Sequence, residues 1–162
     1  MLSIVATPIG NLDDISARAV KVLRAADVIA CEDTRRTRIL LNHHHIQIPS
    51  VYLSYREHQE GRVGMQLIEM LKAGKKVALC TDGGFPGISD PGYRLIRSAI
   101  EEKIAFEVIP GASAVLSALV ASGLSTSSFT FKGFPPRRHG VLKRFFEDER
   151  DMPHTIVIFE SP

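Results

Sequence analysis

Acidic and basic side chains meet in the segment CEDTRRTR, residues 31–38. Acids at the start of a helix interact favourably with the helix dipole, whereas arginines at that end oppose it. One interpretation of this segment is therefore a solvated helix start. The other, equally favoured, is a substrate site in which Arg35 and Arg36 contact phosphates of an RNA and Glu32 or Asp33 lies near a ribose.

Three other segments, TPIGN, TDGGFPGISDPG and PGAS, are rich in glycine and proline and follow short apolar runs. A single loop of this kind is typical of a tight turn. Three of them at the carboxyl ends of parallel strands predict a binding crevice with free backbone N–H and C=O groups. The chain has no G-x-x-x-x-G-K-[ST] and no G-x-G-x-x-G after its first strand, so the loops favour a ligand such as S-adenosylmethionine over a phosphate cradle.

Strands and helices alternate along the chain and would place these loops. Asp13, Asp14 or Ser16 is predicted to cap the first helix, Thr34 to cap the second, and Pro91 to occupy the first position of the fourth. The predicted strands are LSIVAT, DVIAC, VYLSY, KKVALC and AFEVIP, and the predicted helices are DDISARAVKVLRAA, RRTRILLNH, VGMQLIEMLKAG, DPGYRLIRSAIEE and SAVLSALVAS. This alternation predicts an α/β fold with a mainly parallel sheet and helices on both faces.

The alternation breaks at GLSTSSFTFKGFPPRRH, residues 123–139. We expect residues 1–123 to form an N-terminal α/β domain, and residues 124–162 to form a linker and the beginning of a second α/β domain. The second part is predicted to hold a strand at 129–132, a helix at 141–150 and the strand HTIVIF. Nothing follows HTIVIF that could pair with it, so we expect a truncated domain whose last strand lacks a partner unless a second copy supplies one.

Composition limits the possible classes of protein. The chain has 162 residues, of which 44% are hydrophobic, and a net charge of +2. It can bury a core, its charge alone does not argue for nucleic-acid binding, and no apolar run approaches the roughly 18 residues of a membrane helix. The first residues lack the basic leader of a signal peptide. Two cysteines, Cys31 and Cys80, each end an apolar run, which favours reduced thiols in a cytoplasmic protein.

Seven segments, in this order, carry a resemblance to a known family: TPIGNLDDIS, ACEDTRRTRILL, SYREHQE, SDPG, VIPGASAVLSAL, FKGFPPR and FESP. They resemble the tetrapyrrole-methylase-like (class III) methyltransferases, and more closely the ribosomal RNA small-subunit methyltransferase I branch, which methylates a cytidine ribose 2′-hydroxyl. The resemblance implies a two-domain α/β protein, usually a homodimer, with S-adenosylmethionine between the domains. Its partners would be small-subunit ribosomal RNA and the 30S subunit, and a typical member continues for about another domain.

The same resemblance implies a set of cofactor contacts in the glycine-rich loops. One departure is Phe85, which stands where the family usually has threonine, so a side-chain hydroxyl is missing while backbone contacts can remain. The implied cofactor-binding residues are Pro8, Ile9, Asp82, Gly84, Phe85, Ile88, Ser113 and Ala114.

The resemblance also directs attention to a proton acceptor, because a ribose hydroxyl is a poor nucleophile until its proton is removed or hydrogen-bonded. Asp33 and Asp82 are the candidates for that contact, and no metal is needed. Ser89 and Asp90 are predicted to cap the helix that follows, with a second role facing the ligand. The basic segment PPRRHGVLKR is either plain surface or a phosphate contact. The candidate substrate-binding residues are Glu32, Arg35, Arg36, Ser89, Asp90, Arg137 and Arg138.

Two other features are interpreted as structural. The tract His43-His44-His45 resembles a metal-binding sequence, but three adjacent side chains at a helix end do not converge on one ion, and no acid is spaced to join them. A solvated turn is the favoured interpretation. Cys31 and Cys80 are predicted to be small core residues rather than nucleophiles.

Two rival functions remain open. A tetrapyrrole methyltransferase would share the fold but needs a broad apolar cleft, where this chain supplies charge, so it ranks second. A non-catalytic ligand-binding or interaction module is the alternative of a different class. If the parent protein is the ribosomal RNA methyltransferase that the resemblance implies, the fragment by itself is expected to be inactive or weakly active.

Overall fold

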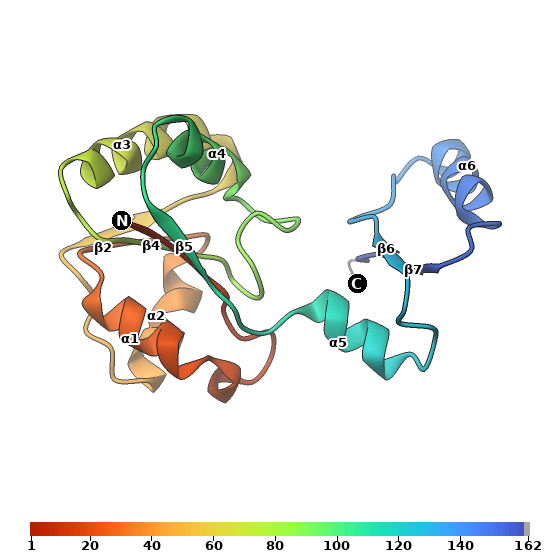
Figure 1. The fold of residues 1–162 in the computed structure, drawn as a ribbon, viewed down its shortest axis with the longest axis horizontal. Coiled ribbons are helices and arrows are strands. Elements are labelled where there is room, and N and C mark those ends of the chain that lie inside the picture. The colour runs from red at the N-terminus through yellow and green to blue at the C-terminus, as the bar shows by residue number, and fades with distance from the viewer. Residues whose placement is uncertain (161–162) are drawn as a thin grey trace. The chain divides into compact units, whose positions relative to one another are not determined.

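A computed structural model describes residues 1–160 (Figure 1). Its contacts divide the chain into two compact units, one comprising Met1–Ser113 and the other beginning at Ala114. The division falls just before helix α5 (Ala114–Ala121), and the boundary predicted at residue 123 lies just after that helix. Within the described residues, no helix has the length and apolarity needed to cross a bilayer.

The first unit contains one five-stranded sheet in which every pair of neighbours is parallel, in the order β3-β2-β4-β1-β5. This confirms the α/β prediction. Its strands are β1 (Leu2–Val5), β2 (Val28–Cys31), β3 (Val51–Ser54), β4 (Val77–Cys80) and β5 (Phe106–Ile109). The strands β1, β2 and β4 are buried along their whole length, because helices cover both faces of a parallel sheet.

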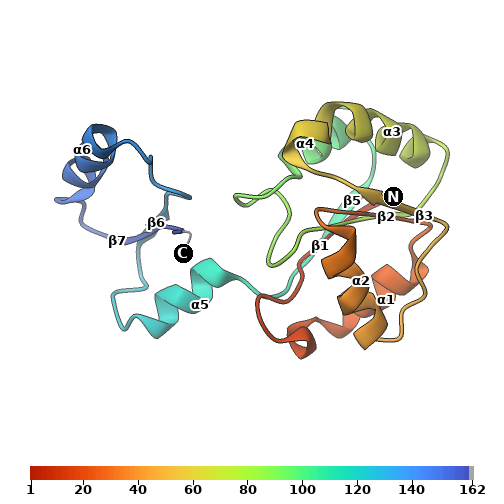
Figure 2. The same ribbon diagram turned by 180° about the vertical axis from the view of Figure 1, so that it is seen from behind.

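Helices α1 (Ala17–Ala25) and α2 (Thr34–His43) lie on one face of the sheet, and α3 (Glu60–Lys72) and α4 (Tyr93–Glu101) lie on the other (Figures 1 and 2). Each face has its own hydrophobic cluster, and these clusters hold the loops at the ends of the strands in place. Short 3₁₀ turns, η1 (Leu12–Asp14) and η2 (Glu57–Gln59), precede α1 and α3.

The helix starts confirm one predicted cap and correct another. Ser16 caps α1, accepting a hydrogen bond from the Ala19 amide at 3.1 Å. The prediction that Thr34 caps α2 is wrong, because Asp33 is the cap and accepts from the Arg35 amide at 2.8 Å. Asp33 still has an extended backbone, whereas Thr34 is already the first helical residue.

The start of α4 differs from its prediction as well. The helix begins at Tyr93 after Gly92, so Pro91 is not its first residue, and neither Ser89 nor Asp90 caps it. The reason is the backbone at Gly92, which has a φ of +146° and donates its amide to a Glu60 carboxylate oxygen at 2.9 Å. A glutamate from α3 therefore does what the sequence assigned to the local side chains.

The second unit contains α5, β6 (Phe129–Phe131), α6 (His139–Glu149) and β7 (Thr155–Val157). The prediction that HTIVIF lacks a partner within the chain is wrong, because β7 pairs with β6 in parallel. Helix α6 starts two residues before its predicted start and forms the crossover that a parallel pair requires. The small core of this unit joins Val115 and Leu119 of α5 to Val157 of β7.

Candidate active site at the carboxyl edge of the sheet

The strand order creates a crevice between β1 and β4. The chain leaves β1 toward β2 through α1 on one face, and it leaves β4 toward β5 through α4 on the other face. Neighbouring strands whose connections depart in opposite directions form a switch point, where open parallel sheets bind their ligands. Two of the glycine-rich segments, TPIGN and TDGGFPGISDPG, follow these two strands.

Hydrogen bonds join these two loops directly. The amides and carbonyls of Thr7 and Gly84 exchange two hydrogen bonds, both 2.9 Å, and the Thr7 hydroxyl donates to the Thr81 carbonyl at 3.0 Å. Gly84 has a φ of +84°, a region that residues with a side chain rarely adopt. The loops after β1 and β4 therefore form a single backbone platform.

The third loop, PGAS after β5, also approaches this platform closely. A Cβ atom built on Gly111 would lie 3.0 Å from the Ala6 Cβ and 3.3 Å from the Ala6 carbonyl oxygen. One built on Gly83 would lie 3.2 Å from the Pro8 carbonyl oxygen. Glycine thus allows three backbone segments to meet at one edge, as their positions after parallel strands predicted.

The predicted cofactor residues fall into four groups. Pro8 and Gly84 are buried within the platform, while Ile9 and Ile88 leave 40% and 48% of their surface exposed. Phe85 and Asp82 are partly buried beside them. Ser113 ends the first unit, and Ala114 begins the second. The contact of these residues with a cofactor stays a prediction.

Asp33, one predicted proton acceptor, is held in ion pairs. Besides capping α2, its carboxylate accepts hydrogen bonds from Arg35 Nε at 3.1 Å and Nη2 at 2.7 Å, and Arg56 lies 3.7 Å away. The Arg35 guanidinium and amide hold the pKa of Asp33 well below its usual range. A carboxylate in such contacts stays ionised and accepts a proton poorly.

Asp82, the other predicted proton acceptor, links the β4 loop to the start of α2. One of its oxygens accepts from the Asp33 amide at 3.0 Å, and the other lies 3.7 Å from Arg36 Nη1. The structure therefore brings both predicted acids and both predicted arginines of CEDTRRTR together.

Two further acids at this edge, Glu32 and Asp90, have raised pKa values, in contrast to Asp33. Burial, then the charge of Asp82, raises the pKa of Glu32. Burial, with the charges of Glu32 and Asp82, raises the pKa of Asp90 to about 6. Asp90 lines a cavity of about 540 Å³, together with Glu32, Arg56, His58 and Ser89. Loops after β2, β3 and β4 form its walls.

Sequence reasoning singled out neither Arg56 nor Glu60. Arg56 donates to the Glu32 carbonyl at 3.2 Å and pairs with Asp33. Glu60, only 8% exposed, accepts from the Gly92 amide and lies 3.5 Å from Arg94. Among the described residues, the buried Tyr55 hydroxyl has no hydrogen-bond partner. Burial, then the charge of the nearby Glu60 carboxylate, raises the pKa of Tyr55. Both residues lie in the segment SYREHQE, whose match to the family is the signal in the sequence that points to Arg56 and Glu60.

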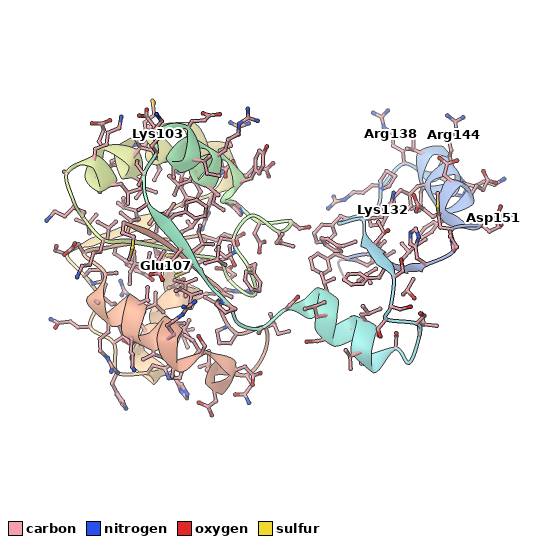
Figure 3. All side chains as sticks on the ribbon, in the orientation of Figure 1. Lys103, Glu107, Lys132, Arg138, Arg144 and Asp151 are labelled. Atoms are coloured by element: carbon pink, nitrogen blue, oxygen red, sulfur yellow. The ribbon has the colours of Figure 1, made fainter. Side chains whose placement is uncertain are left out.

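The predicted substrate arginines are exposed. The side chains of Arg35 and Arg36 are 86% and 71% exposed even though acids lie beside them. Asp33 offsets the unfavourable dipole of arginines in a first turn, which supports the helix-start interpretation without burying either guanidinium. In the second unit, Arg137 and Arg138 are exposed, and Figure 3 shows Arg138 pointing away from the ribbon.

The histidine tract does have an acidic neighbour, which corrects the prediction that none is placed for it. His43 Nε2 lies 2.8 Å from Asp13 Oδ1, and His44 Nε2 lies 2.8 Å from the Leu12 carbonyl oxygen. The contacting residues are 30 and 32 positions apart in the sequence, which hid them from spacing arguments. The expectation that no metal is needed stays a prediction.

The platform fits the chemistry of S-adenosylmethionine. That molecule carries a sulfonium and an ammonium group, and carboxylates are the natural neighbours of such cations. Glu32, Asp82 and Asp90 lie close together, since the charge of Asp82 raises the pKa of Glu32 and the charges of both raise the pKa of Asp90. The exposed apolar faces of Ile9 and Ile88 suit an adenine ring, and the glycine backbone leaves its surface free of side chains.

Comparison with known proteins gives a consistent result. The chain is 48% identical over 161 residues to a protein of Halalkalibacterium halodurans named Ribosomal RNA small subunit methyltransferase I, covering 99% of this chain and 55% of that protein. A Thermotoga maritima protein of the same name is 46% identical over 164 residues, covering 99% and 71%. The chain therefore spans about half the length of the first of these relatives.

Solved structures with the same fold are more distant in sequence. A crystal structure of diphthine synthase matches with a TM-score of 0.78 and 18% identity, over 99% of this chain and 65% of that one. A cobalt precorrin-4 methyltransferase matches with a TM-score of 0.65 and 20% identity, over 85% and 58%. The model of the family Tetrapyrrole (Corrin/Porphyrin) Methylases matches residues 1–162, and the chain belongs to this family.

Proposed function

We propose that the intact protein transfers a methyl group from S-adenosylmethionine to the ribose 2′-hydroxyl of a cytidine in small-subunit ribosomal RNA. The observation that carries the proposal is the network around Asp82, which joins the glycine platform to Arg36 and, through the Asp33 amide, to Arg35. Candidate cofactor and RNA contacts thus belong to one bonded network. Relatives at 44–48% identity, named Ribosomal RNA small subunit methyltransferase I, support the same substrate class.

The platform residues would hold the cofactor. When bound, S-adenosylmethionine supplies a methyl group that its sulfonium already activates. Backbone groups around Gly84 and Phe85 would bond its polar atoms, Ile9 and Ile88 would cover its apolar face, and Asp82 would lie near its positive charge. Pro8, Ser113 and Ala114 complete the proposed cofactor set.

The arginines would hold the RNA. Guanidinium groups bind phosphates in a bidentate manner, which orients the backbone without reading its sequence. Arg35 and Arg36 would act beside the platform with Glu32, Ser89 and Asp90 near the ribose. Arg137 and Arg138 would add phosphate contacts from the second unit.

Orientation would supply most of the catalysis, because the methyl group needs only an in-line nucleophile. The chain's own task is to exclude misaligned hydroxyls and to accept the proton of the correct one. Among the acids of this edge, Asp82 and Asp33 are both committed to contacts with α2, which favours structural roles for them in this reaction.

Dimer formation, the 30S subunit as substrate and a cytoplasmic location belong to the same proposal. They follow from the resemblance and the names of the relatives. Sedimentation of the intact protein across a concentration series tests the dimer, since a monomer at every concentration would contradict it.

A tetrapyrrole substrate is not favoured. Solved structures of a cobalt precorrin-4 methyltransferase and of uroporphyrin-III C-methyltransferase share 18–22% identity with the chain, which supports the fold alone. The cavity beside the platform is lined by charged side chains rather than by the broad apolar surface that a macrocycle requires.

The test supplies the intact protein and labelled S-adenosylmethionine to either small ribosomal subunits or a precorrin-type substrate. We expect label on a cytidine ribose of the ribosomal RNA, identified by nuclease digestion and mass spectrometry. Label in the tetrapyrrole and none in the RNA would reject the proposal.

A further inference from the structure

Within residues 1–160, Asp90 differs from Asp33 and Asp82 in that neither an ion pair nor a backbone amide holds its carboxylate. Asp33 and Asp82 both accept backbone amides and face arginines within 3.7 Å. Among the described residues, Asp90 has no ion pair within 4.0 Å, and only the Thr81 hydroxyl favours its charged form. A carboxylate that accepts a proton during a reaction must be available in this way.

Its position also suits contact with a substrate. Asp90 lines the 540 Å³ cavity, whose walls come from the loops after β2, β3 and β4 at the edge where the platform lies. The preceding residue, Ser89, has a φ of +60°, an unusual value for a residue with a side chain. Two residues after Asp90, the Gly92 amide donates a hydrogen bond to the buried Glu60 carboxylate of α3, which fixes the backbone next to Asp90.

We infer that Asp90 is the proton acceptor for the ribose 2′-hydroxyl, an inference that rests on the function proposed above. The hydroxyl oxygen forms a bond to the methyl carbon as the bond from that carbon to sulfur breaks, and sulfur keeps the electron pair. The hydroxyl proton moves to a carboxylate oxygen of Asp90 and then to water. Charge and atoms balance without any further reactant.

The groups around Asp90 give its carboxylate a basicity that suits proton acceptance. The titratable groups that face it from neighbouring loops and helices are Glu32, Arg56, Glu57, His58, Glu60, Asp82 and Tyr93. Burial and the two nearest acids raise the pKa of Asp90 to about 6. An acceptor of this pKa is ionised at neutral pH and basic enough to bind a proton, whereas the ion-paired Asp33 is too weak a base.

The test compares the intact wild-type protein with Asp90→Asn, which keeps the shape of the side chain. We expect methyl transfer to small ribosomal subunits to fall by about 100- to 10,000-fold, with the Kd for S-adenosylhomocysteine unchanged within threefold. The wild-type rate should decline below about pH 6, and the residual rate of Asp90→Asn should lack that decline. Asp14→Asn, an exposed acid of η1, is the matched control and should leave rate and pH profile unchanged.

A second variant keeps the inference testable if Asp90→Asn does not fold. Glu32→Gln removes a negative neighbour, which should move the acidic decline of the rate to lower pH. The inference is overturned if Asp90→Asn transfers methyl groups within threefold of wild type, or if Glu32→Gln leaves the decline where it was. Wild-type protein that labels no ribosomal RNA would instead reject the proposed function, whatever the variants do.

Discussion

The two basic segments of the molecule differ in how their charges are balanced. At the start of α2, Asp33 caps the helix and pairs with Arg35, and Asp82 lies beside Arg36. At the start of α6, the cap position is Arg138 itself, with no side-chain cap bond, and no residue of that helix is buried. Among residues 1–160, no ion pair involves Arg137 or Arg138.

Arg35 and Arg36 of the first segment are paired with carboxylates, whereas, within the described part of the chain, Arg137 and Arg138 of the second segment are not. A guanidinium held by a carboxylate has a fixed direction but a reduced net field, whereas an unpaired one retains its full charge and its freedom to move. Under the proposed function, the first segment would orient an RNA beside the glycine platform. The second would attract the RNA. Four experiments test this difference and the platform beside the first segment.

The largest effect, on ligand binding, is expected from Gly84→Val, which alters the backbone platform beside the first segment. Valine is strained at a φ of +84°, and its branched side chain would meet Ile9 and disturb both hydrogen bonds to Thr7. We expect binding of S-adenosylhomocysteine to weaken at least about 100-fold, equivalent to roughly 2.7 kcal/mol, as measured by calorimetry.

The matched control is Gly61→Val in α3, where an added Cβ meets nothing within 4 Å. It should bind the ligand as the wild type does. Equal binding by Gly84→Val would mean that the platform is not the cofactor site.

The next effect concerns RNA and compares the segments directly. Arg137→Ala with Arg138→Ala should remove up to about two units from the slope of log K against log salt, since each lost phosphate contact contributes about 0.9. Arg35→Ala with Arg36→Ala should remove less, because Asp33 and Asp82 already offset those charges. Filter binding of ribosomal RNA at several salt concentrations measures both slopes, and a larger loss from the first segment would reverse the comparison.

A smaller effect, on the free energy of unfolding, is expected from Glu60→Ala, which removes the hydrogen bond between α3 and the end of the β4 loop. The substitution leaves the buried Gly92 amide without its acceptor and Arg94 without its partner, at a cost of about 1–3 kcal/mol in the free energy of unfolding. Glu60→Gln keeps an acceptor and should cost less. Urea denaturation measures both, and the exposed Glu69→Ala should change little.

The smallest effect is a pH dependence of stability that arises from Asp90. Its folded pKa of about 6 exceeds its unfolded value, so the folded state binds more protons between about pH 4 and 6 and stability falls as pH rises through that window. Because Asp90 is only half-buried, we expect about 1–2 kcal/mol. Asp33 acts in the opposite direction, since its lowered pKa adds stability that is lost as pH falls below about 4.

Denaturation of wild type and Asp90→Asn at pH 4, 5, 6 and 7 isolates this contribution. The difference in unfolding free energy between the two proteins should grow in favour of the variant as pH rises. A difference that stays constant with pH would show that Asp90 titrates as it does in the unfolded chain.

Much of the first unit could be predicted from local sequence. Runs such as VIAC and VALC are apolar and bounded by turn residues, so their burial as strands follows from neighbouring residues alone. The glycines after these strands likewise predicted an edge where backbones approach, and Gly84 and Gly111 meet that expectation. Ser16 caps α1 by accepting a hydrogen bond from the Ala19 amide, only three residues further along the chain, so this cap also follows from local sequence.

Only the tertiary structure decided which distant residues meet. Strand order placed Thr7 against Gly84, α3 supplied Glu60 to the start of α4, and helix packing brought Asp13 to His43. The tertiary structure likewise paired β7 with β6 and placed Glu32 and Asp82 close to Asp90. The physical reason is that local propensity depends on adjacent side chains, whereas these contacts depend on the order and register in which the chain's elements pack together.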